Sequence, residues 1–244
     1  PKAWFQHYVT GLKTLGWEQC LNEAALWRKP SSKHTDKYLK LSVYVDDNFI
    51  TGPDEFELNE EISVILEKYT GREIVPEVKG DWHSWDVLGA EFDYNRTSRT
   101  MKLYMRSYIK KMADKFNITA KMGSNSSPNP NFPEESVTVE SAEVQFPYRE
   151  IIGSLQWVAT IARPDIARNV NLLSRFLGKP PTFARVSAAK TIIKYLLRTS
   201  LEGISYSPHT EEKFRRTYQH DGDEISVPRS DHVLFNDASF ASMV

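Results

Sequence analysis

Leu39-Lys40-Leu41-Ser42-Val43-Tyr44-Val45-Asp46-Asp47 is the stretch of sequence that decides the fold. Apolar residues occupy every second position of it, and side chains along a β-strand alternate between the two faces of a sheet. The alternate residues from Leu39 to Val45 are therefore expected on one buried face. Two carboxylates end the strand, and Asn48-Phe49-Ile50 resumes an apolar run. The pattern predicts a hairpin whose tight turn exposes Asp46 and Asp47.

Adjacent carboxylates such as Asp46 and Asp47 repel each other, and a shared divalent cation relieves that repulsion. Their hard oxygen ligands suit Mg²⁺ or Mn²⁺. Two such ions can hold both the attacking and the leaving oxygen of a phosphoryl transfer. The alternative is an ordinary surface turn, because aspartate is common in turns. The dipeptide alone favours the surface turn, whereas the rest of the chain favours a metal site.

The size and composition of the chain set broad limits. Its 244 residues suit one large domain or two smaller ones. No segment approaches the roughly 20 apolar residues that cross a bilayer, and no signal-peptide pattern is present, so no membrane partner is expected. Cys20 is the single cysteine, which favours a reducing compartment. Because the chain begins at Pro1 and stops abruptly at Val244, we interpret it as a piece of a longer polypeptide.

The first 105 residues are predicted to be α+β, with helices that back an antiparallel sheet. Apolar residues at helical spacing predict a helix over residues 3–15. Asp54 precedes a second helix, and Glu57 is placed to complete a capping box with it. Residues 87–92 and 100–104 are predicted to form a second hairpin.

The chain from residue 107 onward is predicted to be helical. A short basic helix over residues 107–116 leads to three amphipathic helices without a strand between them. Arg163-Pro164-Asp165 and Lys179-Pro180-Pro181-Thr182 separate those three helices. Residues 207–231 are polar and are interpreted as a connector, and residues 233–238 as the start of a new strand.

Positive charge is concentrated in the helical part of the chain. Residues 147–200 contain nine basic and two acidic residues, a balance of +7, although the whole chain carries −1. Lys190, Lys194 and Arg198 follow each other at four-residue spacing and form one ridge on a helix. A solvated helix face normally mixes both signs. The ridge therefore favours a nucleic-acid partner, bound without sequence specificity.

Longer strings in the helical part have a specific order and spacing. They are Tyr148-Arg149-Glu150-Ile151-Ile152-Gly153-Ser154-Leu155, Ala162-Arg163-Pro164-Asp165-Ile166-Ala167 and Asn171-Leu172-Leu173-Ser174-Arg175-Phe176. Together they resemble the "YR-x-x-IGSL … RPDI … V-N-x-LSRF" pattern of reverse transcriptases from copia-type (pseudovirus-like) long-terminal-repeat retrotransposons. Tyr44-Val45-Asp46-Asp47 matches the catalytic YVDD of that family, and Leu88-Gly89-Ala90-Glu91 matches its LG-x-E hairpin. The resemblance covers the whole chain.

The resemblance implies the fold of a right-hand polymerase and its activity, RNA-directed DNA polymerisation. Residues 1–105 would be the palm, residues 106–200 a helical thumb, and residues 201–244 a connector with the first strand of a truncated ribonuclease H domain. The fingers are absent. Asp46 and Asp47 would be the catalytic ligands of two Mg²⁺ or Mn²⁺ ions.

The resemblance also implies the partners and their contacts. They are an RNA template with a DNA primer, and deoxynucleoside triphosphates, in a cytoplasmic virus-like particle or in the nucleus. Asp237 resembles the first metal ligand of the ribonuclease H domain. The primer strand would lie on a grip formed by Leu88, Gly89, Ala90 and Glu91. Nucleic acid would contact a set of basic residues, namely Arg149, Arg163, Arg175, Lys190, Lys194 and Arg198.

Two alternatives to an active polymerase remain. A third palm carboxylate and the fingers would precede Pro1, so we expect the chain alone to be inactive. A decayed or domesticated copy could instead bind nucleic acid or a protein without catalysis. A phosphodiesterase could use Asp46, Asp47 and Asp93 but would need a nearby cluster of histidine or glutamate. The six histidines are scattered along the chain, at His7, His34, His83, His209, His220 and His232.

Overall fold

The computed structural model describes residues 2–119, 143–210 and 212–213. These residues fall into two compact units, divided between Val75 and Pro76. The boundary predicted at residue 105 differs from this division, because residues 76–105 pack with the helices that follow them. The predicted strand over residues 233–238 and Asp237 within it lie outside the described residues.

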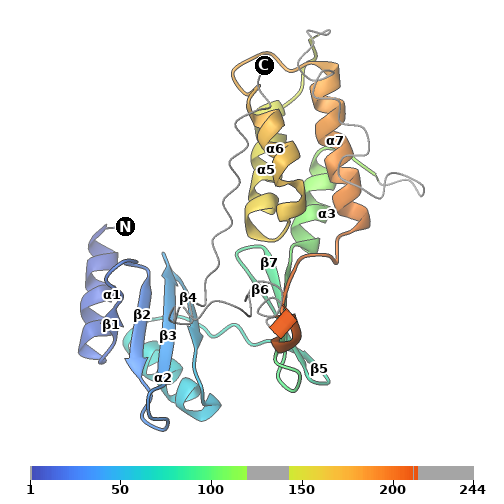
Figure 1. The fold of residues 1–244 in the computed structure, drawn as a ribbon. Coiled ribbons are helices and arrows are strands. Elements are labelled where there is room, and N and C mark those ends of the chain that lie inside the picture. The colour runs from blue at the N-terminus through green and yellow to red at the C-terminus, as the bar shows by residue number, and fades with distance from the viewer. Residues whose placement is uncertain (1, 120–142, 211, 214–244) are drawn as a thin grey trace, which may run out of the picture. The chain divides into compact units, whose positions relative to one another are not determined.

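The first unit is a four-stranded antiparallel sheet with two helices (Figure 1). The strand order is β1-β2-β3-β4, so each strand pairs with its neighbour in the sequence. The sequence pattern predicts the helices and the hairpin but not β1 and β2. The elements are α1 (Lys2–Thr14), β1 (Glu18–Gln19), β2 (Leu26–Pro30), β3 (Tyr38–Tyr44), β4 (Asp47–Thr51) and α2 (Glu55–Lys68).

The core of this unit lies on one face of the sheet. Leu39, Leu41 and Val43 of β3 are buried, as their alternation predicts. Tyr8 and Leu12 of α1 belong to the same apolar cluster, and residues of α2 pack against it. Both helices therefore cover the same face, which leaves the opposite face of the sheet without a helix from this unit.

The start of α2 shows how a polar side chain connects separate segments. Asp54 caps the helix by accepting a hydrogen bond from the Glu57 backbone N–H at 2.8 Å, as predicted. The Glu57 carboxylate does not return to Asp54, so the predicted capping box is only half formed. Instead, the Glu57 carboxylate accepts hydrogen bonds from the Ser31 hydroxyl at 2.6 Å and from the Ser32 backbone N–H at 2.5 Å. These bonds lower the pKa of Glu57 and fix the β2–β3 loop to α2.

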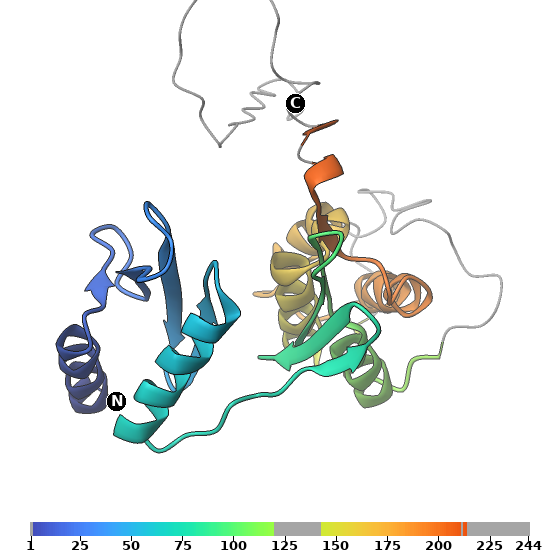
Figure 2. The ribbon, with the colours of Figure 1, turned by 90° about the horizontal axis from the view of Figure 1, so that it is seen from below.

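The second unit combines a five-stranded antiparallel sheet with helices (Figures 1 and 2). The strand order is β5-β6-β7-β8-β9. The strands are β5 (Glu77–Lys79), β6 (Trp82–Val87), β7 (Ala90–Asn95), β8 (Thr100–Tyr104) and β9 (Ile204–Tyr206). The helices are α3 (Arg106–Lys115), α5 (Tyr148–Ile161), η1 (Pro164–Ile166), α6 (Ala167–Ser174) and α7 (Phe183–Arg198). None of the described helices is long and apolar enough to cross a membrane.

The helices and the sheet of this unit share one core. The inward faces predicted for the three amphipathic helices are buried. Ala90, the first residue of β7, and Met105, which links β8 to α3, join the same cluster. Strand β9 lies in the segment predicted as a connector, and it pairs with β8. Gly203 allows this approach, because a Cβ atom there would lie 2.0 Å from the carbonyl oxygen of Leu103. The α+β class is therefore confirmed, while the palm and thumb assignment stays a prediction.

Candidate active site and nucleic-acid interface

The turn between β3 and β4 places the two carboxylates differently. Tyr44 pairs with Asp47, so only Val45 and Asp46 form the turn. Asp46 is exposed at the tip, and Asp47 is half-buried as the first residue of β4. Val45 was predicted on the buried face, and this was wrong, because the chain reverses there. Val45 is 61% exposed and has a φ of +56°.

Alternation along β4 sets the direction of its first side chains. Asp47 shares the helix-free face of the sheet with Tyr44 and Phe49, which are both exposed. Asn48 lies on the other face, where its side-chain oxygen accepts a hydrogen bond from the Tyr8 hydroxyl at 3.0 Å. Burial raises the pKa of Tyr8 to about 12, so this hydroxyl keeps its proton. Asp46 and Asp47 are thus held at the edge of an open sheet face.

The donor atoms of this turn fit a hard divalent cation, but they do not complete its coordination shell. Asp46 and Asp47 supply carboxylate oxygens, the ligands that Mg²⁺ and Mn²⁺ prefer. Among the described residues, no group of three or more histidine, cysteine, aspartate and glutamate side chains could hold a metal. Further ligands would have to come from water, from phosphates or from other residues. Asp93, considered for a phosphodiesterase, instead accepts a hydrogen bond from the Tyr104 hydroxyl at 3.0 Å.

The LG-x-E motif forms the turn between β6 and β7. Val87 pairs with Ala90, so Leu88 and Gly89 are the two turn residues, with φ values of +56° and +78°. Such values are typical of tight hairpin turns that follow the twist of the strands. Leu88 is exposed, whereas Ala90 is buried in the core. Leu88 is therefore the exposed residue of the predicted primer grip, while Gly89 beside it is half-buried.

Glu91 of this motif has a structural contact that the sequence did not indicate. Its carboxylate accepts hydrogen bonds from the Ser107 backbone N–H at 3.1 Å and from the Ser107 hydroxyl at 2.8 Å. Ser107 lies in the first turn of α3, where backbone N–H groups lack partners within the helix. The residue before that helix, Met105, makes no capping hydrogen bond of its own through its side chain. Glu91 thus caps α3 from a distant strand.

Arg163 does not fit the predicted set of phosphate contacts. It is only 1% exposed, and its guanidinium donates to both carboxylate oxygens of Asp165, at 2.9 and 2.7 Å. It also donates to the Thr199 backbone oxygen at 2.9 Å. Partial burial opposes ionisation of Asp165, but the hydrogen bonds from Arg163 and Tyr195 outweigh it and lower the pKa of Asp165. A buried guanidinium with these partners cannot reach a phosphate, so the prediction for Arg163 was wrong.

The other predicted basic residues lie on the surface of the helical part. Arg149, Arg175, Lys194 and Arg198 are exposed. Lys190 is half-buried, with its ammonium 4.9 Å from the centre of the Phe146 ring. The ridge on α7 therefore exposes mainly its last two members, Lys194 and Arg198.

Helix α3 extends the basic surface beyond the predicted residues. It packs against α7, and its side chains Arg106, Lys110 and Lys111 are exposed. The sequence predicts that this helix is basic, but its residues are not among the predicted nucleic-acid contacts. The missing information was that α3 and α7 are neighbours in space.

The exposed face of α5 carries a further candidate contact. Arg149, Gly153 and Trp157 follow each other at four-residue spacing on that face. Trp157 is 38% exposed, and a Cβ atom on Gly153 would meet nothing within 4 Å. An arginine, an open backbone and an exposed aromatic ring on one helix face suit contact with a sugar–phosphate backbone. Of these three residues, only Arg149 is among the contacts predicted from the sequence.

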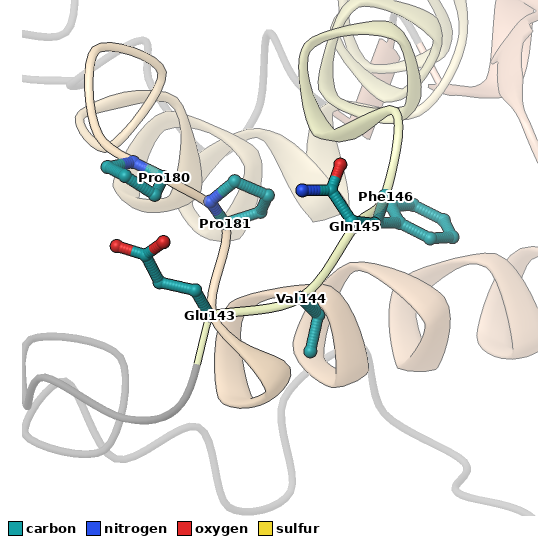
Figure 3. A pocket seen from close by; sticks show the side chains of 6 residues that line it. All are labelled: Glu143, Val144, Gln145, Phe146, Pro180 and Pro181. Atoms are coloured by element: carbon teal, nitrogen blue, oxygen red, sulfur yellow. The ribbon is translucent and has the colours of Figure 1, made fainter.

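A small hollow lies where the segment before α5 meets the segment before α7 (Figure 3). The Val144 backbone N–H donates to the Pro181 backbone oxygen at 2.9 Å and closes one side of it. None of the predicted site residues lines this hollow. Its lining consists of Glu143, Val144, Gln145, Phe146, Pro180 and Pro181.

Comparison with known proteins gives the chain its relatives. It is 31% identical over 206 residues to a retrovirus-related Pol polyprotein from transposon RE1 of Arabidopsis thaliana, an alignment that covers 84% of the chain and 13% of the relative. It is 23% identical over 206 residues to the Pol polyprotein from transposon TNT 1-94 of Nicotiana tabacum, covering 82% and 15%. A putative transposon Ty5-1 protein of Saccharomyces cerevisiae is 26% identical over 207 residues, covering 84% and 63%.

The homologues of this chain are therefore retrovirus-related Pol polyproteins of copia-type transposons, and the resemblance is confirmed. The chain spans less than one sixth of the two plant relatives. No family model matches the chain. No solved structure matches it.

The backbone at Val45 generates a prediction about stability. A β-branched residue at positive φ is strained, at a cost of roughly 1–3 kcal/mol. We expect Val45→Gly to raise the free energy of unfolding by about 1 kcal/mol, since glycine accepts this φ but loses more backbone entropy. The free energy of unfolding of Val45→Ala should lie between those of the wild type and of Val45→Gly. Denaturant unfolding of the three chains measures the difference.

The control is the same substitution at the exposed Val64 of α2. Val64→Gly should lower the free energy of unfolding by up to about 1 kcal/mol, because glycine is a poor helix former. If Val45→Gly destabilises the chain as much as Val64→Gly does, the turn is not strained.

Proposed function

We propose that this chain is the part of a copia-type retrotransposon reverse transcriptase that carries catalytic carboxylates and holds the template–primer. The observation that carries the proposal is the position of the two carboxylates. Asp46 lies in a two-residue turn, and Asp47 follows it on the helix-free face of the sheet. Homology to retrovirus-related Pol polyproteins of transposons supports it.

The proposed reaction adds a nucleotide by in-line attack of the primer 3′-hydroxyl on an α-phosphate. Asp46 would be the principal ligand of the metal ions and Asp47 the secondary one, since Asp46 is the more exposed. When bound, Mg²⁺ ions lower the pKa of the attacking hydroxyl and neutralise charge on the pyrophosphate leaving group. The protein's task is to hold the primer end in place for attack. We assign contact with the primer strand to the Leu88-Gly89 turn, where Leu88 is exposed.

The grip on the nucleic acid is assigned to three helices of the second unit. Lys194 and Arg198 of α7 would bind phosphates together with the basic side chains of α3. Arg149 and Trp157 of α5 would contact the backbone on a second helix face. None of these contacts reads a base, so binding should depend on salt and not on sequence.

A second candidate is a decayed or domesticated copy that binds nucleic acid without catalysis. It would use the same basic helices, and the incomplete ligand set at Asp46 and Asp47 among the described residues is compatible with it. The two candidates differ in one expected result. Only the polymerase requires the carboxylates of Asp46 and Asp47 for primer extension.

The catalytic role of Asp46 is tested in a longer chain that includes the preceding part of its own reading frame. Asp46→Asn should abolish primer extension and leave thermal unfolding unchanged, because it removes a metal-binding charge from an exposed turn. The control is Asp36→Asn, which neutralises an exposed carboxylate in the same unit at a backbone conformation that asparagine tolerates. Retention of more than about a tenth of the activity, roughly 1.4 kcal/mol of barrier, would contradict the role.

The grip is tested by measuring the affinity for an RNA/DNA hybrid at several salt concentrations. Lys194→Gln with Arg198→Gln should weaken binding to every sequence alike. The slope of log affinity against log salt should flatten by up to about 0.9 per lost phosphate contact. The control neutralises Lys13 and Lys37, exposed lysines of the first unit, and should leave the slope as it is. An unchanged slope in the first variant would mean that the ridge does not bind phosphates.

A further inference from the structure

We infer that Arg163 is a positioning residue that holds the C-terminal end of α7, and with it Arg198, in place for contact with nucleic acid. The inference rests on the proposed function and goes beyond it, since it gives the buried arginine of the RPD segment a definite task. That task is carried out through other residues, and Arg163 itself does not touch the ligand.

The contacts of Arg163 join three parts of the chain. Arg163 lies between Ala162, the C-cap of α5, and the start of η1. Its bidentate bond to Asp165 fixes the plane of the guanidinium. From that plane it reaches Thr199, the residue that ends α7, through the backbone oxygen at 2.9 Å and the side-chain oxygen at 2.8 Å. One side chain therefore ties the end of α7 to the junction of α5 and η1.

The end of a helix is where such a contact has the largest effect. The last carbonyl groups of a helix lack partners within it, and a positive charge next to them is favourable. Tyr195, one turn earlier in α7, donates its hydroxyl to Asp165 at 2.8 Å, and its ring centre lies 5.1 Å from the Arg163 guanidinium carbon. The last turn of α7 is thus held on two sides by the Arg163–Asp165 pair.

The geometry favours a positioning role over a contribution to stability alone. A buried ion pair is weak evidence for stability, because apolar residues of similar volume often replace it without loss. Such residues would not fix the direction of the helix end as a planar bidentate guanidinium does. Arg198 precedes Thr199 directly, and the chain continues through Gly203 to β9. If the last turn of α7 loosens, Arg198 loses its fixed direction.

A double-mutant cycle tests this role with the whole chain and an RNA/DNA hybrid. Arg163→Lys keeps the charge but cannot form the bidentate bond. It should weaken binding by up to about eightfold at 0.1 M salt and flatten the salt slope by up to about 0.9, the effect of one lost phosphate contact. Arg198→Gln should have the same effect. Adding Arg163→Lys to Arg198→Gln should then cause no further loss of affinity. Adding it to Arg149→Gln should weaken binding as much as it does in the wild type.

The outcomes separate the inference from the proposed function. Wild-type affinity in Arg163→Lys overturns the positioning role, and so do equal losses in both backgrounds, because they indicate a general structural effect. If Arg163→Lys does not fold, Thr199→Val replaces it in the double-mutant cycle. This substitution removes the hydrogen bond from the Arg163 guanidinium to the Thr199 side-chain oxygen. A wild-type chain without salt-dependent binding to the hybrid overturns the proposed function and this inference together.

Hydrogen exchange measured without nucleic acid provides an independent readout of the contact. Amides from Tyr195 to Tyr206 should exchange faster in Arg163→Lys than in wild type, while those of α1 should not change. Unchanged exchange at the end of α7 overturns the inference whatever the binding experiments show.

Discussion

The alternation of side chains along β3 constrains everything around the candidate active site. Leu39, Leu41 and Val43 must face the two helices, because they form the core of the first unit. A shift of one residue would turn every one of these side chains to the other face of the sheet. The register in turn determines that Tyr44 pairs with Asp47 and that the chain reverses between them. The exposure of Asp46 at the tip and the half-buried position of Asp47 follow from the packing of a core that contains neither residue.

The second unit depends on two charged side chains that act at helix ends. Glu91 accepts hydrogen bonds at the start of α3, and Arg163 donates one at the end of α7. Both places contain backbone groups that the helix itself leaves without partners. Strand β9 then closes the sheet next to β8, so the hairpin with the LG-x-E motif and the basic helices belong to one compact unit. Residues that a motif marks as functional can therefore be the ones that hold the functional surface in place.

The parts of this fold that the sequence predicts are those that depend on local patterns. Helical spacing identified α1, α5 and α7 with their buried faces, and the two-residue alternation identified the hairpin with Asp46. The parts that it does not predict depend on partners far along the chain. Strand β9 has only three residues and pairs with β8, although four α-helices and the short helix η1 separate the two strands among the described elements. The burial of Arg163 likewise requires Thr199 and Tyr195 as partners, which no short motif specifies.

The most direct test of the account is whether Mn²⁺ binds at the β3–β4 turn of the folded chain. Paramagnetic broadening of amide signals by Mn²⁺ reports such binding even when it is weak, and it does not depend on primer extension. The account predicts broadening centred on residues 44–48 at low Mn²⁺ concentrations, and its loss in Asp46→Asn. Broadening centred elsewhere, or equal broadening at this turn in wild type and Asp46→Asn, would contradict it.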